Sequence, residues 1–478
     1  MSKSFKQTAT KGIFWSGVER FSVQGVQFVI MLVMARLLSP SDYGLVGMIM
    51  IFIAISQSLV DSGFSQALIR RQDRTEADNC TVFYFNTVIS ALLYLLLFAI
   101  SPIVAEFYDV PELCGVMRVV SVVIIINALT IVQKTILTAK IDFKTQATAS
   151  FIAAVISGIL GIILAFNRYG VWALVYQQII NQIISAIILW YYSTWHPKLM
   201  YSWLSFRSLF AFGSKLTAIG LIDITYNNIY PIIIGKVFSP ADLGYYSRAK
   251  NFSDLPSSNL TVILHRVTYP LLCQIQNEDE RLAIAYRKFL KISAFVVFPL
   301  MCGLAGLSTP LITILIGEKW LFCSELLTII CFTMMWYPIH SINLNLLQVK
   351  GRSDIYLKLE FIKKGVGLTL LVLSISYGIK AMCAVGILGS LISLAINTYY
   401  TGKIIQVGFF RQMHDLLPTL CLSLLLFVST YSLQYVVSSA CAQLLIGIPL
   451  GMLVYLAPCY YFKFSELDEI LGLLHIRK

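Results

Sequence analysis

The sequence predicts an all-α integral membrane protein with about 14 transmembrane helices, and three observations predict it. Of its 478 residues, 58% are hydrophobic and only 13% are charged, about half the charged fraction of a soluble domain. Two long stretches, residues 82–105 and 416–462, contain no charged residue at all. Basic residues gather at alternate ends of the apolar segments, as they do when helices cross a membrane in alternating directions. Because backbone groups in lipid must pair within their own segment, the apolar runs are expected to be helices.

Apolar segments separated by polar breaks define the expected helices in order along the chain, at about 20 residues for each crossing. The first six are expected near residues 12–37, 44–68, 82–105, 113–138, 146–166 and 170–195. Six more follow near 208–236, 244–273, 289–316, 322–348, 361–377 and 381–403, and a final pair near 415–437 and 441–462. Charges interrupt the first, seventh and eighth of these segments, and the eleventh is short.

The distribution of basic residues orients these helices. Connections on the side of the N-terminus hold 24 Lys and Arg residues, whereas the opposite side holds five, namely Arg36, Arg168, Lys236, Lys319 and Lys380. Because loops rich in Lys and Arg stay in the cytoplasm, the side of the N-terminus is expected to be cytoplasmic. With an even number of helices, the C-terminus is expected there too. The net charge of +12 is therefore a signal of topology, and we expect no nucleic-acid partner.

A ten-residue motif occurs twice, 200 residues apart. Residues 35–44 read ARLLSPSDYG and residues 235–244 read GKVFSPADLG, each between the first and second expected helix of a half. An even number of helices separates the copies, so both are expected outside and the halves form a parallel repeat, one of the symmetries that transporters use. The predicted organisation is an N-terminal lobe over 1–200, a C-terminal lobe over 201–405, an extra helix pair over 406–462 and a cytoplasmic tail over 463–478.

Seven basic residues lie inside the expected helices. If these residues faced lipid, each charge would cost roughly 2.5–3.5 kcal/mol, or on the order of 20 kcal/mol for all seven. Most of them are therefore expected to face a watery cavity, a partner charge or the interface. A cavity with many basic and few acidic residues favours an anionic ligand such as a phosphate or pyrophosphate. The candidate binding residues are Arg20, Arg118, Lys134, Lys215, Arg248, Lys250 and Arg266.

The alternative for each basic residue is snorkelling to the interface or a structural ion pair. This alternative applies most to Arg118, Lys134 and Arg266, which lie near the ends of expected helices. Arg20 and Lys215 are each the only basic residue well inside the first helix of a lobe. If the lobes are related by an axis along the membrane normal, these two residues are expected to face each other across the cavity.

Acidic and amide residues accompany the basic ones. They are candidates for ion coupling or for the polar wall of the cavity: Glu19, Asp61, Asp223, Asn227 and Asp254. Pro231 removes the hydrogen bond to the carbonyl of residue 227, which predicts a local break in the segment 208–236. No metal site, cofactor or catalytic residue is expected.

Several runs resemble the polysaccharide transporter (Wzx-type flippase) family of the MOP superfamily, and are most similar to colanic-acid exporters. They are residues 11–16 (KGIFWS), 19–21 (ERF), 24–28 (QGVQF), 35–48 (ARLLSPSDYGLVGM), 140–144 (KIDFK) and 243–249 (LGYYSRA). One position departs from the family pattern, since Tyr230 stands where the family often has an acidic residue, and Asp223 is the candidate to replace it.

The resemblance implies two six-helix lobes around a central cavity, with an added helix pair. It implies flipping of an undecaprenyl-pyrophosphate-linked oligosaccharide, a lipopolysaccharide O-antigen or exopolysaccharide repeat unit, from the inner to the outer leaflet by alternating access. The expected location is the bacterial plasma membrane. The expected partners are the lipid-linked oligosaccharide, membrane lipids and the polysaccharide polymerase machinery.

Two alternative functions require features that this sequence lacks or has only weakly. A cation-coupled multidrug antiporter of the same superfamily should have an acidic, aromatic cavity, which the surplus of basic residues disfavours. A membrane glycosyltransferase, polymerase or ligase would need catalytic carboxylates or His on a sizeable loop. The acidic cluster Glu278-Asp279-Glu280 lies in a connection rich in Arg and Lys and is interpreted as a solvated surface.

Overall fold

The computed structural model describes residues 22–71 and 73–473, which contain helices and no strand. Contacts between residues divide the chain into two compact units, Met1–Gly244 and Tyr245–Lys478. This division falls after the second copy of the motif, whereas the lobe boundary expected from the repeat falls at residue 200. The lobe boundary stays a prediction.

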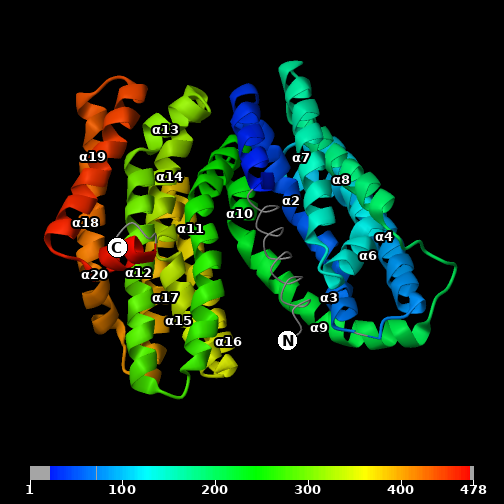
Figure 1. Cartoon of the computed structure of the whole chain (residues 1–478). Helices are drawn as coiled ribbons and strands as arrows, with labels where there is room; N and C mark the ends of the chain where they lie inside the picture. Colours follow the sequence, from blue (N-terminus) through cyan, green and yellow to red (C-terminus); the bar gives the residue numbers. More distant parts are fainter. Residues whose placement is uncertain (1–21, 72, 474–478) are drawn as a thin grey trace. The chain divides into compact units, whose positions relative to one another are not determined.

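Unit 1 consists of a helix over Ser22–Leu37 and the helices that follow it (Figure 1). These are α2 (Pro40–Asp61), α3 (Phe64–Arg70), α4 (Glu76–Tyr108), α5 (Glu112–Val120), α6 (Val122–Ala139), α7 (Phe143–Phe166), α8 (Val171–Tyr192), α9 (Trp203–Asn227), α10 (Ile229–Val237) and the first residues of α11 (Pro240–Gln274). Small residues allow close packing here. A methyl group on Gly158 of α7 would lie 2.0 Å from Ile30, and one on Gly161 would lie 2.9 Å from Gln177 of α8.

Unit 2 contains the rest of α11 and a second group of helices. These are α12 (Asp279–Gly306), α13 (Ser308–Leu315), the short 3₁₀ turn η1 (Glu318–Trp320), α14 (Leu321–Met334), α15 (Tyr337–Val349), α16 (Ser353–Ser374), η2 (Ile375–Tyr377), α17 (Ile379–Ile405), α18 (Phe409–Val436), α19 (Ala440–Tyr461) and α20 (Ser465–Leu473). A bidentate ion pair joins α12 to α18, with Arg287 Nε and Nη2 each 2.6 Å from a carboxylate oxygen of Asp415.

The fold class predicted from the sequence is confirmed. In the described part of the chain, each of the fourteen expected segments falls largely in helical structure, and eleven helices are long and apolar enough to cross a membrane. The other three segments are represented by the Ser22–Leu37 helix, α11 and α16. The count of fourteen crossings therefore stays a prediction.

Several expected boundaries need correction. The segment 289–316 is two helices that part at Leu307, and the segment 322–348 parts between α14 and α15. The expected tail contains α20, whose Glu469 lies 2.9 Å from Lys288 of α12. Because α20 is short and three of its nine residues are acidic, a search for long apolar runs does not detect it.

The two copies of the repeated motif have the same local structure. In the first copy Asp42 accepts hydrogen bonds from Ser39 N (2.8 Å) and Ser39 Oγ (2.7 Å) at the start of α2. In the second copy Asp242 accepts the same bonds from Ser239 N (3.1 Å) and Ser239 Oγ (2.7 Å) at the start of α11. Each is a capping region with proline at the first helical position.

The two helix starts also contact each other reciprocally within unit 1. A methyl group on Gly44 would lie 1.7 Å from the carbonyl oxygen of Pro240, and one on Gly244 would lie 1.9 Å from the carbonyl oxygen of Pro40. Glycine is therefore required at both positions for the backbones to approach this closely. The mutual contact puts the two copies on the same face of the unit, as the parallel repeat predicts.

Candidate functional site

The main candidate in unit 1 is the exposed side of α9. Its buried residues, Ser205, Leu209 and Gly213, recur every fourth position and form one stripe, on the side that packs against α2, α3 and α4. Lys215 lies two positions beyond Gly213, which places it about 200° around the helix from the stripe, and it is exposed. At the midpoint of a membrane-spanning helix, an ammonium group facing lipid is costly. Lys215 therefore requires an aqueous or anionic environment.

The C-terminal end of α9 adds two further predicted residues. Asp223 and Asn227 are both exposed and lie one turn apart. The helix ends at Asn227, and α10 begins at Ile229, two residues before Pro231. The break predicted from Pro231 is confirmed. It leaves polar backbone groups beside these side chains, an arrangement that transporters use at ligand sites.

Asp61 lies where α9 crosses the junction between α2 and α3. Here Gly63 has a left-handed backbone, and a methyl group on it would lie 2.5 Å from the carbonyl oxygen of Gly213 of α9. Asp61 accepts hydrogen bonds from Ser65, from the backbone N at 3.3 Å and from Oγ. The glycine contact fixes α9 beside the end of α2, so Asp61 and Lys215 both lie within three residues of one backbone crossing.

The two remaining predicted cations of unit 1 have different surroundings. Arg118 of α5 donates from Nε to Ser101 Oγ of α4 at 2.9 Å, and its guanidinium lies 4.3 Å from the centre of the Phe98 ring. These contacts are a hydrogen bond and a cation–π interaction within unit 1, and neither is the ion pair expected as the structural alternative. Lys134 is half-buried on α6.

In unit 2 the candidate residues are spread along α11. Lys250 Nζ lies 3.3 Å from Asp254 Oδ1, and both side chains are about one-third exposed. Arg248 is half-buried, and Arg266 is exposed. Buried hydroxyl groups line another side of the helix, and one of them, Ser257 Oγ, donates to Met334 O of α14 at 2.7 Å.

Arg20 and Glu19 lie outside the described residues. Within unit 1 the structure puts Asp223 and Asn227 at one end of α9, whereas Lys215 lies on the side of α9 away from the crossing at which Asp61 lies. Within unit 2 it pairs Lys250 with Asp254. Among the described residues, no group of three or more His, Cys, Asp or Glu side chains could hold a metal ion.

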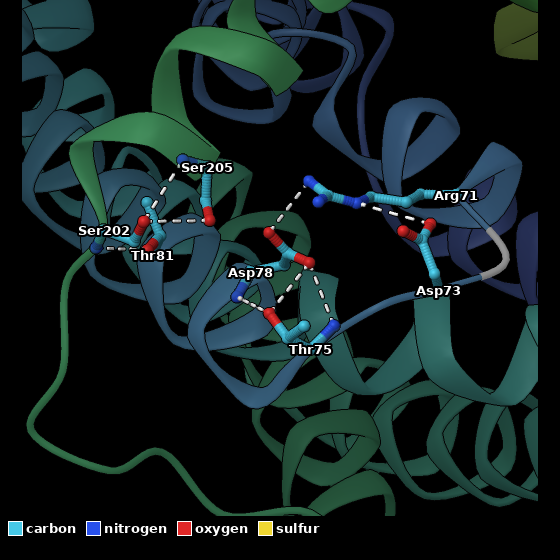
Figure 2. A network of polar contacts seen from close by, with 7 residues as sticks. All are labelled: Arg71, Asp73, Thr75, Asp78, Thr81, Ser202 and Ser205. Atoms are coloured by element: carbon cyan, nitrogen blue, oxygen red, sulfur yellow. Dashed lines mark hydrogen bonds and ion pairs between the residues drawn. The ribbon is translucent and has the colours of Figure 1, made fainter.

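A polar network that the sequence did not predict holds the start of α4 (Figure 2). Asp78 is fully buried and accepts from Thr75 N at 2.9 Å and from Arg71 Nη1 at 3.1 Å. One turn later Thr81 Oγ1 accepts from Ser202 N at 2.9 Å, which attaches the connection before α9 to α4. The motif Thr-x-x-Asp at residues 75–78 is a recognisable capping signal. The network fixes the position from which α9 starts.

Known proteins resemble this chain in sequence. The family described as "Polysaccharide biosynthesis protein" matches residues 33–325. The teichuronic acid biosynthesis protein TuaB of Bacillus subtilis is 26% identical over 95% of this chain and 95% of its own. The lipopolysaccharide biosynthesis protein WzxC of Escherichia coli is 23% identical over 83% of this chain and 80% of its own.

Two solved structures share the fold. The lipid II flippase MurJ in an inward closed conformation has a TM-score of 0.75 and 18% identity, and the match covers 94% of this chain and 99% of MurJ. An inward-facing multidrug resistance MATE transporter of the MOP superfamily has a TM-score of 0.63 and 13% identity, over 80% of this chain and 96% of its own.

Proposed function

Because this chain belongs to the family of polysaccharide biosynthesis proteins, we propose that it is a flippase for an undecaprenyl-pyrophosphate-linked oligosaccharide. The cargo is an O-antigen or exopolysaccharide repeat unit, which the protein moves from the inner to the outer leaflet by alternating access. The family resemblance seen in the sequence motifs is confirmed, and the chain is a multi-pass membrane protein.

The observation that carries the proposal is the charge on α9 and α11. Lys215 lies at the midpoint of α9 on the side away from the buried stripe, and Arg248, Lys250 and Arg266 follow on α11. A pyrophosphate offers several anionic oxygens, which make charge-assisted hydrogen bonds to ammonium and guanidinium groups. The lipid-linked pyrophosphate is thus the part of the cargo that Lys215 recognises.

The same residues give alternating access its physical basis. A ligand shifts a conformational equilibrium only by its differential affinity for the two states. Lys215 binds the pyrophosphate in the state open to the cytoplasm, and its separation from the pyrophosphate in the other state permits release. Asp61, Asp223, Asn227 and Asp254 are the candidates for coupling to an ion.

The alternative is a cation-coupled multidrug antiporter, whose fold this chain shares at a TM-score of 0.63. Export of cations requires acidic groups in the transport path, whereas Lys215 occupies the midpoint of α9. The relatives of this chain are proteins of teichuronic acid and lipopolysaccharide biosynthesis, which also supports glycan transport. We propose no enzymatic activity for the chain.

A deletion strain tests the proposal in cells. Loss of the gene should cause a lipid-linked oligosaccharide to accumulate in the inner leaflet and should stop export of the glycan. Re-expression of the wild-type chain should restore both, and the Lys215→Ala chain should not. Unchanged glycan export in the deletion strain, together with increased sensitivity to cationic drugs, would support the antiporter instead.

A further inference from the structure

Unit 2 contains an open groove between α13, α14, α18 and α19, which we call the α14–α18 groove. Its volume is about 760 Å³, within the range of roughly 300–1,000 Å³ that is typical of small-molecule sites. It lies at the end of the unit where α14 and α19 begin and α18 ends. The distribution of basic residues predicts that this end faces outside. The lining residues are Thr309, Leu321, Ser324, Glu325, Thr328, Ile329, Tyr431, Gln434, Tyr435 and Gln443.

The lining combines polar and apolar surface among the membrane helices. Leu321 and Ile329 are its aliphatic members, and each of the others carries a hydroxyl, amide or carboxylate group. A lipid acyl chain in the groove would remove these groups from water without offering hydrogen bonds, which is unfavourable. The groove is therefore suited to a ligand that both donates and accepts hydrogen bonds.

One wall of the groove is aromatic and is held in place by its neighbours. Tyr431 stacks on Phe427 with ring centres 5.3 Å apart, and Tyr435 meets Tyr431 edge-on at 6.3 Å. Phe427 in turn contacts Phe332 of α14 at 5.0 Å. Since the three α18 rings recur every fourth residue, they form one stripe that ends in the groove. Tyr435 is 78% exposed, so a face of this stripe is open to a ligand.

Other lining residues supply fixed hydrogen-bonding groups. Thr309 Oγ1 and Ser324 Oγ lie 3.3 Å apart, and Gln443 donates from Nε2 to Val437 O at 2.6 Å. Glu325 forms an ion pair with Lys380. Because this pairing offsets the carboxylate charge, the groove has little net charge that would select either a cation or an anion.

Flat apolar ring faces together with hydroxyl, amide and carboxylate groups match one ligand chemistry. A sugar presents C–H groups on its faces and hydroxyl groups around its edge, and these can satisfy both kinds of group at once. We propose that the α14–α18 groove binds one or two sugar units of a glycan, with Tyr431 and Tyr435 against the sugar faces and Glu325, Gln434 and Gln443 on its hydroxyl groups. Its role as a receiving site on the outer side rests on the proposed flippase function. Its ability to bind sugar does not depend on the flippase function.

Saturation-transfer NMR on the purified full chain in nanodiscs tests the proposal. The probes are soluble disaccharides of neutral hexoses, of N-acetylhexosamines and of hexuronic acids. At least one class should bind saturably, and Tyr435→Ala and Gln434→Ala should each weaken that binding by about tenfold or more. Tyr377→Ala is the matched control, because Tyr377 is 81% exposed, lies at the same predicted end and does not line the groove.

The variants must elute and melt like the wild-type chain, and Tyr435→Phe, which keeps the ring, should retain most of the binding. Failure of all three disaccharide classes to bind would overturn the proposal. So would equal losses in Tyr377→Ala and Tyr435→Ala, or preferential binding of tetraphenylphosphonium or glycerol phosphate. Lys215→Ala separates this proposal from the proposed function, since it should stop transport and leave disaccharide binding unchanged.

Discussion

Substitution of Gly44 by alanine should disrupt the contact between the two motif copies. The new methyl group would lie 1.7 Å from the carbonyl oxygen of Pro240, whereas real Cβ contacts stay beyond 3.0 Å. The obstacle is backbone, so it cannot rotate away, and the starts of α2 and α11 must separate by about 1 Å in a tightly packed region. Overpacking of this kind costs about 1–3 kcal/mol, against a gain of about 1 kcal/mol or less from the better helix propensity of alanine.

Unfolding of the purified protein in mixed micelles measures this effect. Gly365→Ala is the matched control, because Gly365 also lies within a helix and no atom lies within 4 Å of its added methyl group. We expect Gly44→Ala and Gly244→Ala to be less stable than wild type and Gly365→Ala to be at least as stable. Since both glycines serve one contact, the double variant should lose less than the sum of the single losses. A Gly44→Ala protein as stable as Gly365→Ala would refute the reciprocal contact.

Three further predictions concern transport, stability and topology. Lys215→Ala should reduce glycan export by more than about tenfold at normal protein abundance, through loss of a charge-assisted contact. Arg118→Ala, which alters the contacts with Ser101 and Phe98, should leave most of the export intact. A larger loss of export in Arg118→Ala than in Lys215→Ala would contradict the proposed site. Asp415→Ala should destabilise the protein by about 1.5–3 kcal/mol, because it removes two charge-assisted hydrogen bonds from Arg287, whose side chain is 30% exposed. An apolar replacement of both residues should recover much of the loss, as denaturation curves would show. Reporter fusions at residues 109 and 240 should report the outer side and one at 280 the cytoplasm, and a result with 240 and 280 on the same side would refute the predicted topology.

The elements that the sequence predicts best are those with a local signal. Apolar runs predict the membrane helices because lipid requires them, and Pro231 predicts the break between α9 and α10 because a proline lacks the N–H that the helix needs. The capping residues of the repeated motif, Ser39 with Asp42 and Ser239 with Asp242, are also local. For each of these the sequence contains both the residue and its partner within a few positions.

Features that depend on distant residues were not predictable in the same way. Arg287 and Asp415 are separated by 128 positions, and the α14–α18 groove combines residues from four helices. Composition also places a charge in a helix without indicating the side that it occupies. Arg118 and Lys215 were both candidates for anion binding, yet Arg118 contacts Ser101 and Phe98, whereas Lys215 lies opposite the buried stripe of its helix.

The proposed flippase activity is tested most directly by reconstitution. The purified chain is placed in vesicles that contain a fluorescent undecaprenyl-pyrophosphate-linked oligosaccharide, and a membrane-impermeant quencher reports how much of it reaches the outer leaflet. The account predicts that wild-type protein moves the labelled lipid and that Lys215→Ala protein, incorporated to the same level, does not. Movement at the rate of protein-free vesicles, or equal movement by the wild-type and Lys215→Ala proteins, would contradict it.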